Sequence, residues 1–108
     1  FQCLILTIKG DLVLLTRAPD LRQAQNTSII NDIRIWVDKD QSDPTDELKN
    51  ILSELSLEKS NLGIEYEAYG LTGRNAMRLN DSLKNFATLH DKSELILFLI
   101  GFRLALLT

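Results

Sequence analysis

The stretch that decides the fold runs from Ile30 to Leu55 and reads INDIRIWVDKDQSDPTDELKNILSEL. Residues 29–38 alternate in polarity with the period of two that is typical of a β-strand. A polar turn follows at residues 39–42. A helix is predicted directly after it, so the stretch contains one strand, one turn and one helix.

Four features predict that helix. Asp43 offers a side-chain oxygen as N-cap, and Pro44 stands at the first helical position, where its missing N–H removes no hydrogen bond. Acidic side chains follow in the first turn, where they suit the positive end of the helix dipole. The apolar residues recur at i, i+3, i+4 and i+7, and they are Leu48, Ile51, Leu52 and Leu55. This spacing predicts one apolar stripe that packs on a sheet.

The two faces of the predicted strand carry different side chains. We expect the core face to carry Ile33, Ile35 and Val37. The opposite face carries Arg34 and Trp36. One interpretation is a helix-covered face on which the indole packs while the guanidinium extends to water. The other is a recognition surface, because Trp and Arg are enriched at binding hot spots.

Two apolar runs, residues 2–8 and 12–16, precede this stretch. The glycine-containing turn at residues 9–11 joins them, which predicts a β-hairpin. Because nearly every position is apolar, we expect both strands to be covered on both faces. Residues 17–28 are polar and are predicted to form a surface connection with at most one or two helical turns.

The second half of the chain predicts two further strands, at residues 63–67 and 86–89. Between them, Thr72 is a plausible N-cap for a helix that ends near Asn85. The apolar face of this helix is Ala76, Leu79 and Leu83. Asp91 and Glu94 have capping-box spacing for a last helix. Strands that alternate with helices predict an α/β domain in which helices cover the sheet.

Composition narrows the class of protein. The chain has 108 residues and a net charge of −3, and its basic residues are spread out, so we expect one domain without a nucleic-acid surface. The single cysteine, Cys3, lies in an apolar run, which favours a buried, inert thiol and a reducing, cytoplasmic location. The apolar segment 95–107 contains Arg103 and is too short to span a membrane. We expect it to be a core helix or to pack on a further domain.

Searches for catalytic and metal-binding patterns identify no site. No two cysteines or histidines have metal-ligand spacing, and His90 is predicted to be a surface residue. The glycines at 70 and 73 precede a helix but lack the lysine of a phosphate loop. The acidic residues of 38–47 lack the spacing of a calcium loop. No catalytic residue and no metal ligand is therefore predicted.

Five segments together resemble the N-terminal domain of the creatinase/prolidase family, and the resemblance extends from about residue 4 to residue 96. They are Leu14–Arg17, the Asn31–Asp38 strand, Asp43-Pro44 at a helix start, Leu62–Glu65, and Leu71-Thr72 at the next helix start. The family includes Xaa-Pro dipeptidases, aminopeptidase P enzymes and creatinase-like hydrolases. The resemblance implies a mixed β-sheet flanked by helices, with a ribonuclease H-like topology and no catalysis of its own.

The resemblance also implies what lies outside the chain. Residues 1–108 would be one such domain, without the family's first helix and strand, which would precede Phe1, and without the catalytic domain. That C-terminal domain holds a dinuclear divalent metal site in the family, so this chain would hold no cofactor. Residues 97–108 depart from the family's usual link into it.

In the family, the N-terminal domain helps to form the dimer and restricts substrate size at the partner's active-site mouth. Our candidates for this gating or dimer surface are Arg17, Asn26, Arg34 and Trp36. The implied partners are a second copy and the catalytic domain, with no nucleic acid and no membrane. The alternative is a stand-alone protein-interaction module of the same fold, and an autonomous small hydrolase is a third, weaker reading.

Overall fold

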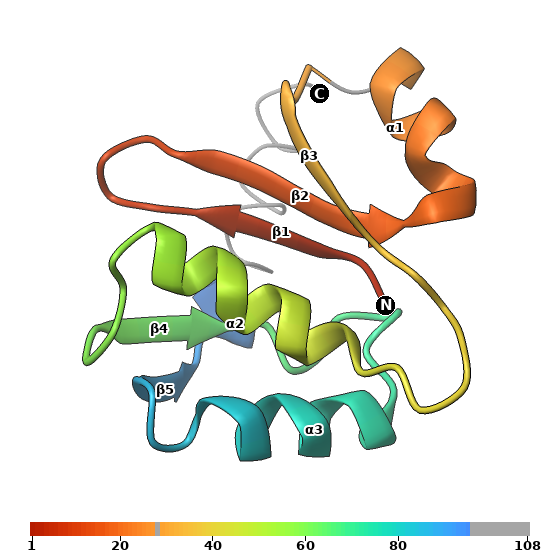
Figure 1. The fold of residues 1–108 in the computed structure, drawn as a ribbon. Coiled ribbons are helices and arrows are strands. Elements are labelled where there is room, and N and C mark those ends of the chain that lie inside the picture. The colour runs from red at the N-terminus through yellow and green to blue at the C-terminus, as the bar shows by residue number, and fades with distance from the viewer. Residues whose placement is uncertain (28, 96–108) are drawn as a thin grey trace. The chain divides into compact units, whose positions relative to one another are not determined.

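The computed structural model describes residues 1–27 and 29–95 of the chain (Figure 1). These residues form two compact units, which divide between Leu55 and Ser56. The first unit contains a three-stranded sheet, and the second contains a two-stranded sheet. Each unit also carries helices, as expected for an α/β chain.

The sheet of the first unit is mixed and has the strand order β1-β2-β3. Strand β1 (Cys3–Leu6) runs antiparallel to β2 (Leu12–Arg17), which confirms the hairpin. In the turn, Gly10 has a φ of 95°, a left-handed conformation that glycine adopts without a steric penalty. Strand β3 (Asp32–Trp36) runs parallel to β2.

The side chains of the two hairpin strands differ in burial. In β2, residues Val13 to Thr16 are all buried, as predicted. In β1, however, Leu4 is 57% exposed and Leu6 is 73% exposed, so the prediction that both strands are covered on both faces is wrong for β1. The reason is position: β2 lies between two strands, whereas β1 lies at an edge of the sheet.

A helical crossover joins β2 to the parallel strand β3. Two parallel strands need such a connection, because a tight turn can join only antiparallel neighbours. It consists of the short 3-10 helix η1 (Ala18–Asp20) and helix α1 (Leu21–Thr27). Pro19 is the second residue of η1, and α1 buries Ala24, so the connection contains more helix than the one or two turns predicted for residues 17–28.

Strand β3 has the predicted alternation but not the predicted core face. Ile35 is 42% exposed and Val37 is 56% exposed, whereas Arg34 and Trp36 are half-buried. The assignment of Ile35 and Val37 to the core is therefore wrong. Strand β3 is the second edge of this sheet, and its Arg34 side is the one that contacts helix α2.

Helix α2 (Pro44–Glu54) has the predicted start. An oxygen of Asp43, Oδ1, accepts hydrogen bonds from the backbone N–H of Thr45 at 2.9 Å and from its hydroxyl at 2.7 Å. The apolar stripe is buried at Leu48, Ile51 and Leu52, while the predicted fourth member, Leu55, follows the last helical residue.

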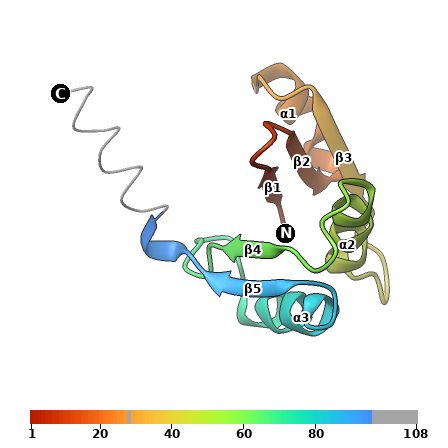
Figure 2. The same cartoon turned by 90° about the vertical axis from the view of Figure 1, so that its left-hand side faces the viewer.

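The second unit pairs β4 (Asn61–Ile64) in parallel with β5 (Thr88–Asp91), and helix α3 (Gly73–Leu83) connects them (Figure 2). The hydroxyl of Thr72 accepts the N–H of Asn75 at 3.2 Å, which confirms the predicted cap. Both strands are displaced by about two residues from their predicted ranges.

The displacement has a cause in the pairing of these two strands. Thr88 donates its backbone N–H to Ser60 at 2.9 Å, and Lys92 donates to Ile64 at 2.9 Å. The bonding begins at Phe86, whose carbonyl accepts the backbone N–H of Lys59 at 2.7 Å, and the paired strand β5 starts two residues later, at Thr88. Alternation within one strand cannot reveal this register, because it depends on a partner far away in the sequence.

The described chain ends in a capped helical turn at residues 93–95. Oδ1 of Asp91 accepts the backbone N–H of Ser93 at 3.0 Å and its hydroxyl at 2.7 Å, so Asp91 acts as the predicted cap. The expected apolar segment 95–107 lies, apart from Leu95, outside the described residues. Within residues 1–27 and 29–95, no helix is long and apolar enough to cross a membrane.

Candidate functional site

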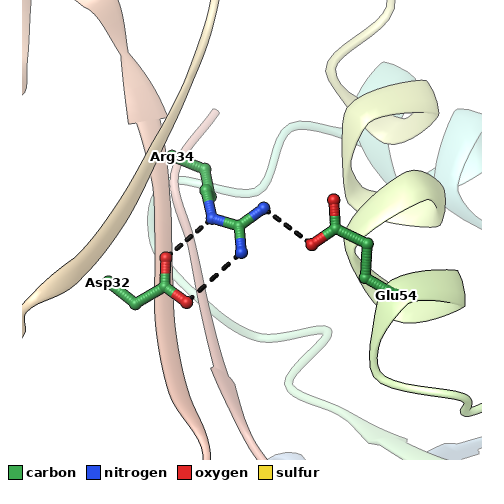
Figure 3. A network of polar contacts seen from close by, with 3 residues as sticks. All are labelled: Asp32, Arg34 and Glu54. Atoms are coloured by element: carbon green, nitrogen blue, oxygen red, sulfur yellow. Dashed lines mark hydrogen bonds and ion pairs between the residues drawn. The ribbon is translucent and has the colours of Figure 1, made fainter.

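Arg34 lies between two carboxylates of the first unit (Figure 3). Its Nε contacts Oδ1 of Asp32 at 2.7 Å, and its Nη2 contacts Oδ2 at 3.3 Å, which is a two-pronged contact with one carboxylate. Its Nη1 contacts Oε2 of Glu54 at 2.9 Å. One guanidinium therefore joins strand β3 to the last residue of helix α2.

Local structure explains why these three groups meet. Asp32 and Arg34 are two residues apart on one strand, so their side chains point to the same face. Glu54 ends α2, and the last turn of that helix carries no basic residue to balance the negative end of its dipole. Arg34 supplies that positive charge from the neighbouring strand.

The electrostatics of this cluster keep the guanidinium charged. The hydrogen bonds that Arg34 donates, first to Asp32 and then to Glu54, raise its pKa above its ordinary value. The cluster carries two negative charges and one positive charge, so its net charge is −1. The side chains of Arg34, Asp32 and Glu54 keep 37%, 45% and 59% of their surface exposed, so water screens their attraction.

Trp36 is hydrogen-bonded to the first residue of the chain. Its indole N–H donates to the backbone carbonyl oxygen of Phe1 at 2.9 Å, although the two residues are 35 positions apart. Trp36 is the register partner of Arg17 on β2, so the indole extends across β2 to reach Phe1. The single tryptophan thus links strand β3 to Phe1, two residues before β1 begins.

The other two candidates lie on the crossover between β2 and β3. Arg17 ends β2, and its Nε contacts Oδ2 of Asp20 at 3.2 Å. This ion pair spans the start of η1 and is almost half exposed on both sides. Asn26 is exposed near the end of α1.

The structure brings three of the four candidates onto one face of the sheet. Arg34 and Trp36 share a face because they are two residues apart, and Arg17 shares it because it is the partner of Trp36. Asn26 lies on a separate element. Each of Arg17, Arg34 and Trp36 makes at least one side-chain hydrogen bond within the chain.

The arrangement offers binding contacts but no reacting group. Burial raises the pKa of the Cys3 thiol to about 11, so little thiolate forms at neutral pH. In the part of the chain that the structure describes, no three His, Cys, Asp or Glu side chains are grouped so that they could hold a metal ion.

Sequence reasoning did not identify a polar cluster in the second unit. The hydroxyl of Ser93 accepts the backbone N–H of Glu67 at 3.1 Å while it donates to Asp91. These bonds from Ser93 lower the pKa of the Asp91 carboxyl. Partial burial and then the Asp91 charge raise the pKa of Tyr66, whose hydroxyl donates to Asn80 at 2.6 Å. Only the cap signal at Asp91 pointed to this cluster.

His90 is exposed, as predicted, and its Nε2 lies 3.0 Å from Oδ1 of Asn61. Asn61 and His90 come from the first residue of β4 and the third residue of β5, so this contact connects the two paired strands. It therefore supports a structural role for His90.

Comparisons with known proteins agree on the type of domain. Residues 1–98 match the family model described as Creatinase/Prolidase N-terminal domain. A solved structure of a dipeptidase from Pyrococcus horikoshii OT3 has the same fold, with a TM-score of 0.60 and 22% sequence identity. The match covers 89% of this chain and 24% of the dipeptidase chain. No curated protein sequence matches.

Proposed function

Because the chain belongs to the creatinase/prolidase family as its N-terminal domain, we propose that it serves a metal-dependent Xaa-Pro peptidase-like or creatinase-like hydrolase without catalysing the reaction. Its roles there are dimerisation and substrate gating, in the cytoplasm. The observation that carries the proposal is the match over residues 1–98. The likeness to a dipeptidase structure supports the fold on which it depends.

The proposed gating surface is the partly exposed part of this sheet face, at Arg17, Arg34 and Trp36, beside the part that α2 covers. An indole held by the Phe1 carbonyl and a guanidinium held by two carboxylates lose little side-chain freedom when a substrate or partner approaches. A surface that is already ordered pays less entropy on binding. Such a rigid wall suits the exclusion of large substrates.

The chemistry of hydrolysis belongs, in this proposal, to a separate catalytic domain. The divalent metals that the family uses would be bound by that domain, which would activate water and polarise the scissile carbonyl. The described residues of this chain offer no matching set of ligands. Their contribution is to shape the entrance and to hold two subunits together.

The test is Trp36→Ala in the full-length enzyme. We expect the ratio of kcat/KM for a dipeptide to kcat/KM for a longer peptide to fall several-fold, because removing the indole widens the entrance. Trp36→Phe is the matched control, since it keeps an aromatic wall and loses only the hydrogen bond to Phe1. An unchanged ratio together with a large loss of stability would assign Trp36 to the fold alone.

The second candidate function is a stand-alone protein-interaction module. The exposed leucines of β1 favour it, because they offer an apolar surface to another chain. The two candidates differ in the rest of the gene. Downstream codons for two aspartates, a histidine and two glutamates at metal-ligand positions would support the enzyme, and a stop codon soon after Thr108 would support the module.

A further inference from the structure

The end of β5 is where the chain leaves the two-stranded sheet of the second unit. Strand β5 ends at Asp91, and a helical turn begins two residues later, at Ser93 (Figure 2). Every residue of the proposed gating surface precedes this point, whereas the catalytic domain of the proposed function is C-terminal to it. Residues 91–95 are therefore part of the covalent connection between the gating surface and that domain.

A backbone hydrogen bond holds the first residue after the strand. The N–H of Lys92 donates to the carbonyl of Ile64, the last residue of β4, at 2.9 Å. The ladder of bonds between the two parallel strands thus extends one residue beyond β5. The chain therefore turns away from the sheet only after it has been bonded to the neighbouring strand.

A glycine makes room for the side chain of Lys92. A Cβ atom at position 63 would lie 2.9 Å from Cγ of Lys92 and 3.4 Å from its Cβ. The first distance is shorter than two carbon atoms approach without repulsion. Because Cγ is close to the backbone, Lys92 cannot avoid such an atom by moving only the end of its side chain. Gly63 thus lets Lys92 lie against β4, and close approach of this kind is a common reason for a glycine within a strand.

The side chain of Ser93 adds a buried connection to an earlier loop. Ser93 is only 3% exposed. Its hydroxyl donates to Oδ1 of Asp91 at 2.7 Å and accepts the backbone N–H of Glu67 at 3.1 Å. Its backbone N–H also donates to Oδ1 of Asp91, at 3.0 Å. One buried hydroxyl thus ties the start of the helical turn to the loop after β4, 26 residues earlier in the chain.

These contacts together form an exit clasp, which consists of Gly63, Glu67, Asp91, Lys92 and Ser93. We propose that Ser93 is a positioning residue, which fixes the direction in which the chain leaves the sheet toward the catalytic domain. The inference deepens the proposed function and rests on it, because a gate excludes large substrates only while its place at the entrance is fixed. A displacement of about 1 Å far from the chemistry can change a rate many-fold.

Substrate length is the property that a loose gate changes. A dipeptide is small enough to pass a wall that only restricts size, so its turnover does not depend on the clasp. A longer peptide is rejected by that wall, and a wall that can move rejects it less. The clasp therefore acts on the discrimination between substrates and not on the reaction itself.

Ser93→Ala in the full-length enzyme tests this role. We expect the ratio of kcat/KM for a dipeptide to kcat/KM for a longer peptide to fall several-fold, while kcat for the dipeptide stays unchanged. Ser82→Ala is the matched control, since Ser82 lies on α3 outside the clasp. Assays well below the melting temperature of each variant separate this effect from a loss of stability. A lower melting temperature with an unchanged ratio would overturn the proposal.

A pair of glycine variants tests the same role without removing a polar group. Gly63→Ala should lower the ratio as Ser93→Ala does, because the added methyl group displaces Lys92. Gly70→Ala is the control, since a Cβ at that position would have no described atom within 4 Å beyond its own neighbours in the chain. An equal ratio in the two glycine variants would contradict the clasp.

Amide hydrogen exchange in the full-length protein shows whether the clasp opens. In Ser93→Ala the Glu67 amide loses its acceptor, so it should exchange faster than in the wild type. In Ser82→Ala its exchange should stay at the wild-type rate. Mass spectrometry of a peptide that covers the loop after β4 measures both, and unchanged protection of Glu67 in Ser93→Ala would also overturn the proposal.

Trp36→Ala separates this inference from the proposed function. If Trp36→Ala lowers the ratio and the two clasp variants do not, the positioning role is overturned while gating stands. If the clasp variants alone lower the ratio, the positioning role stands and a residue other than Trp36 forms the wall. If none of the three variants lowers it, gating is overturned and the positioning role with it.

Discussion

At the scale of single residues, the polar side chains of the first unit connect elements that are distant in sequence. Arg34 joins β3 to the end of α2, and Trp36 joins β3 to Phe1. Both Arg34 and Trp36 are also candidates for the gating or dimer surface. Arg34 still reaches the surface despite these contacts, because its side chain remains 37% exposed.

Removal of the Arg34 charge measures how strongly this cluster holds the first unit. Arg34→Gln should lower the free energy of unfolding by less than about 1 kcal/mol, since all three side chains are more than a third exposed. Urea denaturation measures the loss, and added salt should reduce it.

A double-mutant cycle with Glu54→Gln isolates the contact between β3 and α2. We expect a coupling of a few tenths of a kcal/mol. Arg22→Gln, which removes an exposed charge on α1, is the control. A coupling of zero would mean that Arg34 does not hold the helix.

Asp91 gives the second unit a dependence on pH. Its pKa is lowered in the folded chain by the bonds from Ser93, so the folded state favours the charged carboxylate. This contribution to stability is present above the unfolded pKa of about 3.9 and is lost as the pH falls through the lower, folded value.

Variants of this cap check that dependence. Asp91→Asn should be less stable than the wild type at neutral pH, and the difference should shrink in acid. Ser93→Ala should give part of the same effect, because it removes one of the two donors to Asp91. The measurement is the urea midpoint at several pH values, and a constant difference would contradict the assignment.

At the scale of elements, helix caps and strand positions decide how each segment behaves. Helices α2 and α3 both begin at a polar side chain that accepts a backbone N–H in the first turn. Strand β2 is buried because it is central, and β1 and β3 are half-exposed because they are edges. The apolar sequences of β1 and β2 are alike, yet β2 is buried and β1 is partly exposed.

The Asp43 cap of helix α2 should contribute measurably to the stability of the fold. Asp43→Ala should lower the free energy of unfolding by about 1–2 kcal/mol, because it removes the acceptor of the Thr45 N–H and leaves the fully buried Thr45 hydroxyl unpaired. Asp43→Asn keeps an acceptor oxygen and should recover most of the loss. Chemical denaturation compares the three proteins, and equal stability of all three would contradict the cap.

At the scale of the whole molecule, the chain corresponds to one domain of the family to which it belongs. It matches a family domain over residues 1–98 and spans about a quarter, 24%, of the dipeptidase chain whose fold it shares. Its two outer strands differ in charge, because residues 1–8 carry no charged side chain whereas β3 carries Asp32 and Arg34.

The sequence by itself determined the local structure of this protein. The hairpin around Gly10, the caps at Asp43 and Thr72, and the apolar stripe of α2 all depend on residues within a few positions of one another. The order of five segments was also enough to predict the family, which the match over residues 1–98 confirms.

Only the tertiary structure decided the faces and the partners. Strand alternation separates two faces but does not say which one is covered, and β3 covers its Arg34 side because α2 returns to that side. Glu54 lies 20 residues from Arg34, and Phe1 lies 35 residues from Trp36. Contacts over such separations depend on how the elements pack, and no local pattern encodes them.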